Sequence, residues 1–459
     1  MTLLEAFIAI VGAWRAAFPQ ERSHLRAVRQ ALGLLACLGR RTLSRIIWSN
    51  GGQHRDWRAD YFLHSRCRWD PQQLFAPILR QALAWCRSRY VGVAVDDTRL
   101  RKTGRSILQA FYQRDPMSPP FHVNLMLGLR FLQASLLLPL YRVAAVGCRA
   151  LPIRFEDASV VKRPSRRASA EEWHSYRLAA RAHSLSSQFV RMMGAVRAAL
   201  DAAGGTLKIL VLAVDGSFCN RTVFGALLAR VEILARARKD ATLCRRAPAC
   251  SRRFYEREKF TPDQVRRNEA LAWKKTTLFY GGRWRKVRYK DLAEVYWQGG
   301  ARRRPLRLLV VAPTPYRKRN SGRLYYRKPG YLLTTALAAP ARTLLQIYFD
   351  RWQIEVNHRE EKDTLGVGQA QLWNVQAVPK QPALAVASYS ALLLASLLAF
   401  GAGRGKAYAA LPRWRRNAKR PSCLDLITLL RREMAEHPEQ VACFGLEPSY
   451  ERLTAAAAA

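Results

Sequence analysis

The chain has 459 residues, of which 49% are hydrophobic, so it is long enough for about three domains with ordinary cores. Lysine and arginine number 77 against 33 aspartate and glutamate residues, which gives a formal net charge of +44 at pH 7. Codon bias in a GC-rich genome explains part of this excess, and a polyanionic partner explains the rest better than solubility does. The nine cysteines form no C-x-x-C pair, so the sequence suggests neither a zinc ribbon nor a redox motif, and most of them fit small buried thiols in a reducing cytosol.

The first 88 residues predict helices. The apolar start of the chain carries Glu5 and lacks a basic leader, so it indicates a helix rather than a signal peptide. Residues 40–69 combine arginine with tryptophan and tyrosine around a Gly-Gly break at 51–52. This pattern suits a small DNA-binding helical domain, and equally a basic helical pair that only packs.

The next stretch predicts the order β-β-β-α-β. A strand is expected over 90–98, and "RSILQAFYQ" and "FHVNLMLGLRFLQASLLLPL" fit two further strands. A proline- and arginine-rich loop then leads into one long amphipathic helix, over about 169–203. Residues 204–217 form a continuous apolar run between Gly-Gly and Asp-Gly, which is typical of a buried parallel strand.

Residues 220–330 alternate arginine, lysine, tyrosine and tryptophan at strand-like spacing, which predicts a basic, β-rich insertion. Strand character returns at 307–313 and 331–337. The apolar segment 382–403 is long enough to cross a bilayer. It is rich in alanine and serine, so we expect a buried core helix and no membrane span, with a basic helical region over 406–459.

Residues 347–366 predict one helix with a polar face. Four polar residues of this segment are Tyr348, Arg351, Glu355 and Lys362. At about 100° per residue they project within an arc of about 60°. Gly366 is expected to end the helix.

Acidic residues stand at the ends of two of the predicted strands. Asp96 and Asp97 end the first strand, and Asp215 ends the later apolar one. Each aspartate alone is explained by a turn, and Glu355 alone by an ion pair with Arg351. Carboxylates gathered at neighbouring strand ends repel one another unless divalent cations neutralise them, and all-oxygen ligands suit Mg²⁺ or Mn²⁺. Two such ions can promote an in-line phosphoryl displacement, and the net charge points to a nucleic-acid substrate.

Three motifs in order resemble those of one family. The spacing Tyr348-x2-Arg351-x3-Glu355-x6-Lys362 resembles the Y-R-E-K signature of a large group of bacterial insertion-sequence DDE transposases. "VAVDDT" resembles that family's first-Asp strand, "LAVDGSFCN" its second-Asp strand, and "YLLTTAL…IYFDRWQIE" its approach to the catalytic Glu. The resemblance covers roughly residues 90–375.

The resemblance implies an α/β fold: a ribonuclease H-like mixed sheet flanked by helices, with a β-rich basic insertion and helical terminal regions. It implies that Asp96, Asp215 and Glu355 are catalytic and bind two Mg²⁺ ions, for which Mn²⁺ substitutes. The family's first motif is D-x-T, which favours Asp96, with Asp97 as the alternative.

The other signature residues are expected to bind DNA. The resemblance implies that Arg351 and Lys362 bind phosphates near the transposon end and that Tyr348 contacts the backbone there. At about 1.5 Å per residue, Lys362 lies about 10 Å along a helix from Glu355, which suits a neighbouring phosphate better than a shared metal. Either Trp284 or Trp297 of the insertion is a candidate to stack a flipped base.

The implied activity is cleavage of DNA at the ends of the element and transfer of the 3′-OH ends into target DNA, by a homodimer on paired ends. We expect a cytoplasmic, nucleoid-associated protein. Two alternatives stay open: an inactive DNA-binding protein of the same fold, and a metal-dependent nuclease without strand transfer. The predicted domains are an end-binding region over 1–88, a core over 89–219 and 331–405, the insertion over 220–330 and the tail over 406–459.

Overall fold

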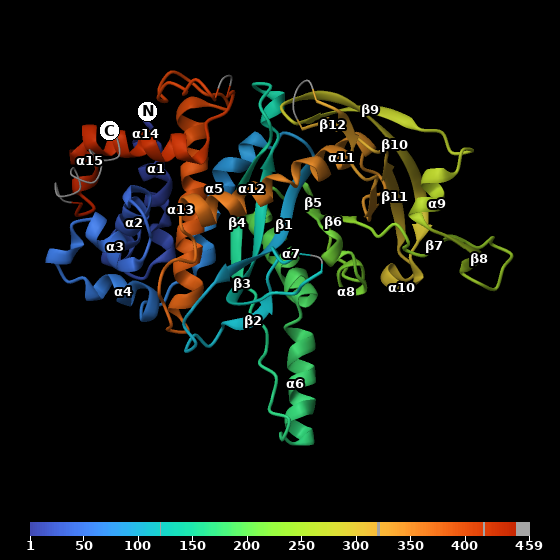
Figure 1. The fold of residues 1–459 in the computed structure, drawn as a ribbon, viewed down its shortest axis with the longest axis horizontal. Helices are drawn as coiled ribbons and strands as arrows, with labels where there is room; N and C mark the ends of the chain where they lie inside the picture. Colours follow the sequence, from blue (N-terminus) through green and yellow to red (C-terminus); the bar gives the residue numbers. More distant parts are fainter. Residues whose placement is uncertain (120, 319–321, 416–417, 447–459) are drawn as a thin grey trace. The chain divides into compact units, whose positions relative to one another are not determined.

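The computed structural model describes residues 1–119, 121–318, 322–415 and 418–446. It is a mixed α/β structure with a large mixed sheet flanked by helices, which confirms the predicted class (Figure 1). The chain divides into two compact units. Unit 1 comprises Met1–Trp85, Asp97–His183 and Ile354–Ala459, and unit 2 comprises Cys86–Asp96 and Ser184–Gln353. The end of the predicted tail, residues 447–459, lies outside the described residues.

A long apolar helix forms the centre of the helical part of unit 1. This helix is α13 (Ala377–Phe400), and four N-terminal helices pack on it (Figure 1). They are α1 (Leu3–Gly12), α2 (Glu21–Ala36), α4 (Arg58–Ser65) and α5 (Phe75–Ala82). The short α3 (Leu43–Ser49) packs on α2, and α14 (Cys423–Glu436), followed by α15 (Pro438–Ala442), packs on α1 and α2. Helices therefore fill the stretch before the first strand.

Among the described residues, α13 is the one helix long and apolar enough to cross a membrane. Most of it is buried: 83% of its most apolar window lies inside the structure. The cause is the packing of α1, α2, α4 and α5 around it. This arrangement is compatible with a soluble protein and agrees with the expected core helix.

Unit 1 also contains an antiparallel set of strands. These are β2 (Phe111–Arg114), β3 (Leu125–Leu138) and β4 (Arg149–Asp157), with β3 in the middle. The sequence predicted a loop where β4 lies. Pro152 conceals this strand, because proline cannot donate to a ladder and is confined to edges and bulges. Here Pro152 stands beside a register shift opposite Ala134 and Ser135, on a strand that pairs with β3 alone.

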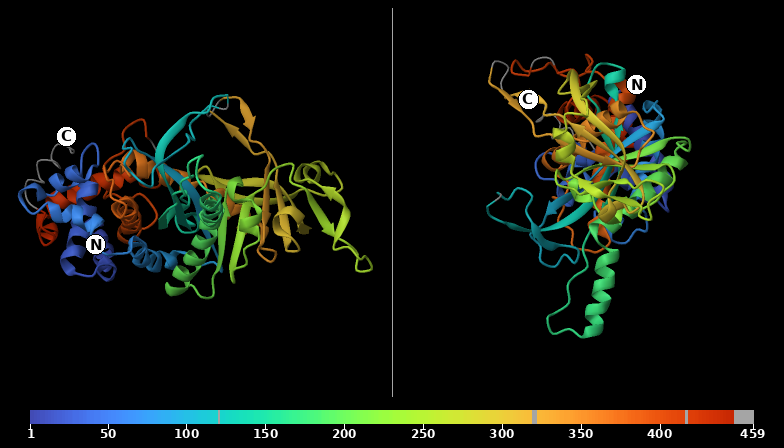
Figure 2. Two further views of the ribbon diagram at one scale, coloured as in Figure 1. Left: turned by 90° about the horizontal axis from the view of Figure 1, so that it is seen from below. Right: turned by 90° about the vertical axis from the view of Figure 1, so that its right-hand side faces the viewer.

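Unit 2 is built on a sheet that is parallel at one side and antiparallel at the other. The first part of β1 (Tyr90–Arg101) pairs in parallel with β5 (Ile209–Val214), which pairs in parallel with β6 (Val231–Arg236). Antiparallel strands continue from β6: β14 (Gly330–Thr334), β11 (Pro305–Val311), β10 (Arg283–Tyr296), β7 (Leu243–Arg246) and β8 (Tyr255–Phe260), with β9 (Lys274–Tyr280) also on β10. The β7–β8 hairpin can be followed as the yellow-green strands in the left view of Figure 2.

Short elements complete the insertion. They are α8 (Arg221–Phe224), α9 (Pro262–Arg267), α10 (Gln298–Ala301) and the small β12 (Pro315–Arg317) and β13 (Leu324–Tyr326) pair. The predicted insertion is therefore rich in strands, but its first strand, β6, extends the parallel part of the sheet.

The single helix expected over 169–203 is wrong. Two helices occupy the stretch, α6 (Ala170–Ala182) and α7 (Leu185–Ala202). Ser184 starts the second helix, because its side chain accepts a hydrogen bond from the amide of Ser187. The boundary between the two units falls at the same point, between His183 and Ser184.

A buried histidine lies between the N-terminal helices of unit 1. The His64 side chain is fully buried, and its Nε2 lies 2.7 Å from Gln30 Oε1. Because the Gln30 amide nitrogen donates to Asp60, the Gln30 oxygen is the acceptor and His64 Nε2 carries a proton. Burial, and secondarily the charge of Lys380, lowers the pKa of His64 to about 3. His64 is therefore neutral in the folded protein at physiological pH.

Acidification should destabilise unit 1 through His64. In the unfolded chain His64 takes up a proton below about pH 6.5, whereas in the folded protein it stays neutral, so stability falls as pH drops below that value. When the pH falls from 7 to 5, this residue should lower the free energy of unfolding by about 2 kcal/mol. Urea unfolding at the two pH values should show that loss reduced by about 2 kcal/mol in His64→Gln. The exposed His54→Gln variant is the control; an equal pH dependence in both variants contradicts the assignment.

Candidate functional site

The register of two parallel strands aligns two of the candidate catalytic carboxylates. In unit 2 the β1–β5 pairing runs from Tyr90 opposite Ile209 to Ala94 opposite Ala213. Continuing this register by two residues brings Asp96 opposite Asp215, just where β5 ends. Residues opposite each other in a parallel pair share a face of the sheet. Asp96 and Asp215 are thus at one level at the carboxyl end of these strands.

Two residues of the Y-R-E-K signature lie beside these carboxylates. Arg351 Nη1 is 3.9 Å from Asp96 Oδ2, and both side chains are mostly buried. Burial raises the pKa of Tyr348, while the charges of Arg351 and Arg236 oppose that shift and Asp215 adds to it. Unit 2 therefore brings Asp96, Asp215, Tyr348 and Arg351 together, with Arg236 from the end of β6.

The Asp215 carboxylate is held by its own turn. Its Oδ1 accepts hydrogen bonds from the Ser217 amide at 2.9 Å and from the Ser217 hydroxyl at 2.6 Å. Nearby, burial and the charge of Asp215 raise the pKa of the Cys219 thiol to about 12. Cys219 is therefore a protonated, unreactive thiol beside the site.

Asp97 belongs to unit 1 and has a structural partner there. Its Oδ2 accepts a hydrogen bond from Arg130 Nε at 2.8 Å, and Arg99 lies 4.0 Å away. Since neighbouring strand residues face opposite ways, Asp97 cannot share the face of Asp96 and Asp215. The geometry thus favours Asp96 over Asp97 as the candidate carboxylate aligned with Asp215, and the D-x-T spacing favours the same residue.

The helix that carries the signature is broken, so the single helix expected over 347–366 is wrong. It consists of α11 (Ala341–Asp350), α12 (Gln353–Arg359) and a π-helical turn over Glu360–Thr364. Gly366 does end it, with φ +60° and a backbone hydrogen bond from Val367 to Glu361 across the turn. The angular positions calculated for an unbroken helix do not apply across these breaks.

Buried side chains of unit 1 account for the π-turn. Glu360 accepts a hydrogen bond from the Tyr389 hydroxyl, and Glu361 accepts one from Gln133 Nε2 at 2.8 Å. Glu361 is 1% exposed and also lies 3.4 Å from His358 Nδ1. Both glutamates are thus tied to the core, and a wide turn lets two adjacent residues reach it.

Glu355 and Lys362 lie in unit 1, Glu355 in the first turn of α12 and Lys362 in the π-turn. Their side chains are partly buried. Asp96, Asp215, Tyr348 and Arg351 belong to unit 2. The two groups are adjacent along the chain, because Glu355 follows Arg351 by only four residues.

A divalent metal ion needs several converging donor atoms. Within the residues that the structure describes, no three His, Cys, Asp or Glu side chains converge as a metal site. Unit 2 alone supplies two aligned carboxylates, and oxygen donors of this kind suit Mg²⁺ or Mn²⁺. Asp96 and Asp215 therefore fit such an ion in chemical type, with Glu355 as the third candidate donor.

The two candidate base-stacking tryptophans differ in surroundings. Trp297 packs edge-on against Phe224, with ring centroids 5.7 Å apart, and lies directly over Gly300. Trp284 on β10 is 43% exposed, and the Arg342 guanidinium lies 5.8 Å from its ring. Trp284 also packs edge-on against Phe279, with ring centroids 5.3 Å apart, but it offers an accessible ring next to a cation.

Two arginines of the site region were missed from the sequence. Arg236 was missed because strand β6, at whose end it stands, was not predicted. Arg130 was missed because its partner Asp97 lies on another strand, and no local spacing joins the two.

No family model matches this chain, and no curated protein matches it.

Replacing Asp97 should destabilise unit 1. The variant Asp97→Asn removes a charge-assisted hydrogen bond and leaves the largely buried Arg130 without its anion, which should cost about 1–2 kcal/mol. The exposed Arg432–Glu436 pair provides the control: Glu436→Gln should change the free energy of unfolding by less than about 0.5 kcal/mol. Urea unfolding measures both. An Asp97→Asn protein as stable as the wild type would remove the structural role of Asp97.

Proposed function

We propose that the protein is a DNA transposase that cleaves phosphodiester bonds at the ends of an insertion sequence and transfers the 3′-OH ends to target DNA. The observation that carries this proposal is the alignment of Asp96 with Asp215 next to Tyr348 and Arg351. Residues far apart in the sequence, and matching three separate motifs of the family, are neighbours in unit 2.

The strand arrangement supports a ribonuclease H-like core. In unit 2, β1, β5 and β6 are parallel, and α7 precedes β5 as a crossover helix. In unit 1, β3 and β4 are antiparallel, and the amide of Lys102, just after β1, donates to Leu127 of β3. An antiparallel group followed by a helix and parallel strands is the order expected of such a core.

The insertion supports DNA as the substrate. Many of its basic side chains are exposed, among them Arg252, Arg253, Arg283, Lys286 and Arg288. Phosphate neutralisation by such residues supplies most of the sequence-independent affinity for DNA. The exposed Trp284 lies in the same region and could stack an unpaired base.

Each residue of the site has a role in this proposal. Asp96, Asp215 and Glu355 would hold divalent ions, which when bound stabilise the attacking and leaving oxygens of phosphoryl transfer. Ser217 fixes the orientation of the Asp215 carboxylate. Tyr348 stays a neutral phenol because burial raises its pKa, so its hydroxyl can donate to a phosphate oxygen. The Arg351 guanidinium suits phosphate by shape and charge.

A supercoiled plasmid carrying the element's own ends tests the proposal. The wild type with Mg²⁺ should cut at those ends and yield joined products. Asp215→Asn and Glu355→Gln should each lower cutting on the order of a thousandfold, because lost metal ligation is worth several kcal/mol in the transition state. The control Asp363→Asn removes an exposed carboxylate of the π-turn that is outside the signature, and it should cut normally.

Other outcomes select the alternatives. Metal-dependent nicks without joined products would indicate a nuclease that lacks strand transfer. Binding of the ends without any cutting by the wild type would indicate an inactive DNA-binding protein of the same fold.

A further inference from the structure

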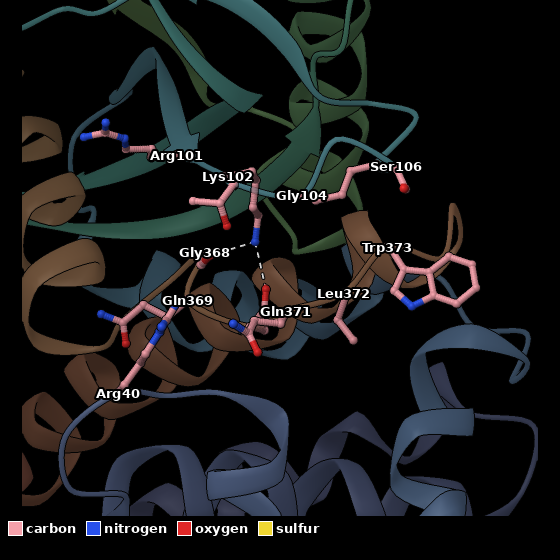
Figure 3. Close-up of a pocket in the computed structure, with 13 residues that line it drawn as sticks. Arg40, Arg101, Lys102, Gly104, Ser106, Gly368, Gln369, Gln371, Leu372 and Trp373 are labelled. Carbon is pink, nitrogen blue, oxygen red and sulfur yellow. Dashed lines mark hydrogen bonds between the residues drawn. The ribbon is translucent and has the colours of Figure 1, made fainter.

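A pocket of about 560 Å³ opens in unit 1 (Figure 3). Its walls are residues 101–104, 106 and 107, which include the end of β1, and the loop 368–373, with Arg40 from the segment after α2. None of the three proposed metal ligands lines it. Pockets of this volume accommodate small organic ligands.

Hydrogen bonds within the protein fix the shape of the pocket. The Lys102 ammonium crosses from one wall to the other and donates to the carbonyls of Gly368 at 2.7 Å and Ala370 at 2.8 Å (Figure 3). Gly368 has φ +94°, and a Cβ there would lie 3.0 Å from Leu100 Cβ. The Gln369 side chain accepts a hydrogen bond from the Arg41 amide at 2.8 Å. The walls are therefore held in place by the chain itself.

The charge of the pocket suits an anion. Arg40, Arg101 and Lys102 line it, and no aspartate or glutamate does. Burial, and secondarily the charge of Arg40, lowers the pKa of Lys102 to about 8, because water does not fully solvate its ammonium group. A bound anion would offset the cost of gathering these like charges.

The opposite side of the pocket is aromatic. Trp373 is 70% exposed, which is unusual for so large an apolar side chain at the mouth of a formed pocket. In Figure 3 its indole lies at one end of the pocket, Arg40 and Arg101 lie at the other, and Lys102 lies between. A ligand with a flat ring at one end and a negative charge at the other matches this layout.

We propose that this pocket binds a short unpaired stretch of a nucleic-acid strand, with one base stacked on Trp373 and the phosphate of a neighbouring nucleotide at Arg40 and Arg101. Paired bases have their faces covered by neighbours, so the base must be unstacked to lie on the indole. The chemistry is that of a nucleic-acid strand; its identity as DNA rests on the proposed function.

Photocrosslinking tests the proposal. A 15-nucleotide single-stranded oligothymidine with one 5-iododeoxyuridine is irradiated with the full-length protein, and the attached peptide is identified by mass spectrometry. The crosslink should form on Trp373. The variant Trp373→Ala should lose it and bind the oligonucleotide about fivefold or more weakly, since base stacking on an aromatic side chain contributes that much.

Matched variants separate this site from general basic binding. Trp414 is 89% exposed, belongs to unit 1 and does not line the pocket, so Trp414→Ala should keep the Trp373 crosslink. Arg101→Gln should lower the salt dependence of binding by about one phosphate contact more than Arg105→Gln, whose residue lies outside the pocket. Equal crosslinking and affinity in wild type and Trp373→Ala would overturn the proposal.

Competition with dTMP distinguishes a strand from a free nucleotide. A crosslink that persists in millimolar dTMP supports a DNA strand as the ligand. Displacement by dTMP at concentrations equal to those of the oligonucleotide would overturn the proposed strand and indicate a free nucleotide as the ligand. The result is independent of catalysis: a protein that cuts its ends without the Trp373 crosslink loses only this proposal, and one that crosslinks without cutting loses only the transposase proposal.

Discussion

The fixed register between β1 and β5 is the constraint on which the site depends. Five successive residue pairs hold it, and the strand residues that form them are nearly all buried. Both faces of these strands are buried, so a shift by one residue would put each closely packed side chain against the wrong neighbours, and core packing therefore locks the pairing. Because the pairing is locked, Asp96 and Asp215 reach the strand ends at the same level. The catalytic proposal therefore depends on hydrophobic packing several residues away from the carboxylates.

Carboxylates placed together at strand ends need compensation. In unit 2 the nearby cations are Arg351, 3.9 Å from Asp96, and Arg236, whose charge acts on Tyr348. Asp97 has a separate partner in Arg130. Asp96 and Asp97 are thus consecutive in the chain but have different surroundings. One belongs to an ion pair within unit 1, and the other faces a second carboxylate across the strand pair.

The sequence predicted those parts of the molecule that local pattern determines. The continuous apolar runs predicted β1 and β5, and the long apolar segment predicted α13. The prediction from sequence failed for elements whose structure depends on tertiary contacts. Strand β4 is obscured by Pro152, which a bulge accommodates, and the π-turn exists because Glu360 and Glu361 both find buried partners in distant segments. The break before α7 had a local signal, Ser184, that was overlooked.

Motif spacing grouped residues that come from separate elements of the fold. Asp96, Asp215, Tyr348 and Arg351 were all named from the sequence, and they lie together in unit 2. The Lys102 pocket was invisible to such reasoning, because its walls come from segments more than two hundred residues apart. Only the folded chain brings a lysine after β1 to the carbonyls that follow the π-turn.

The central claim is that Asp96, Asp215 and Glu355 act as one metal-binding set. Iron(II) accepts octahedral oxygen ligands in place of Mg²⁺. With added hydrogen peroxide it yields hydroxyl radicals that cut the polypeptide beside the bound ion, and ascorbate reduces the resulting iron(III) back to iron(II). Mapping these cuts in the full-length protein tests the claim most directly. The account predicts cuts next to all three residues, suppressed by excess Mg²⁺ and absent in Asp215→Asn. Cuts near Asp96 and Asp215 but none near Glu355 would contradict it.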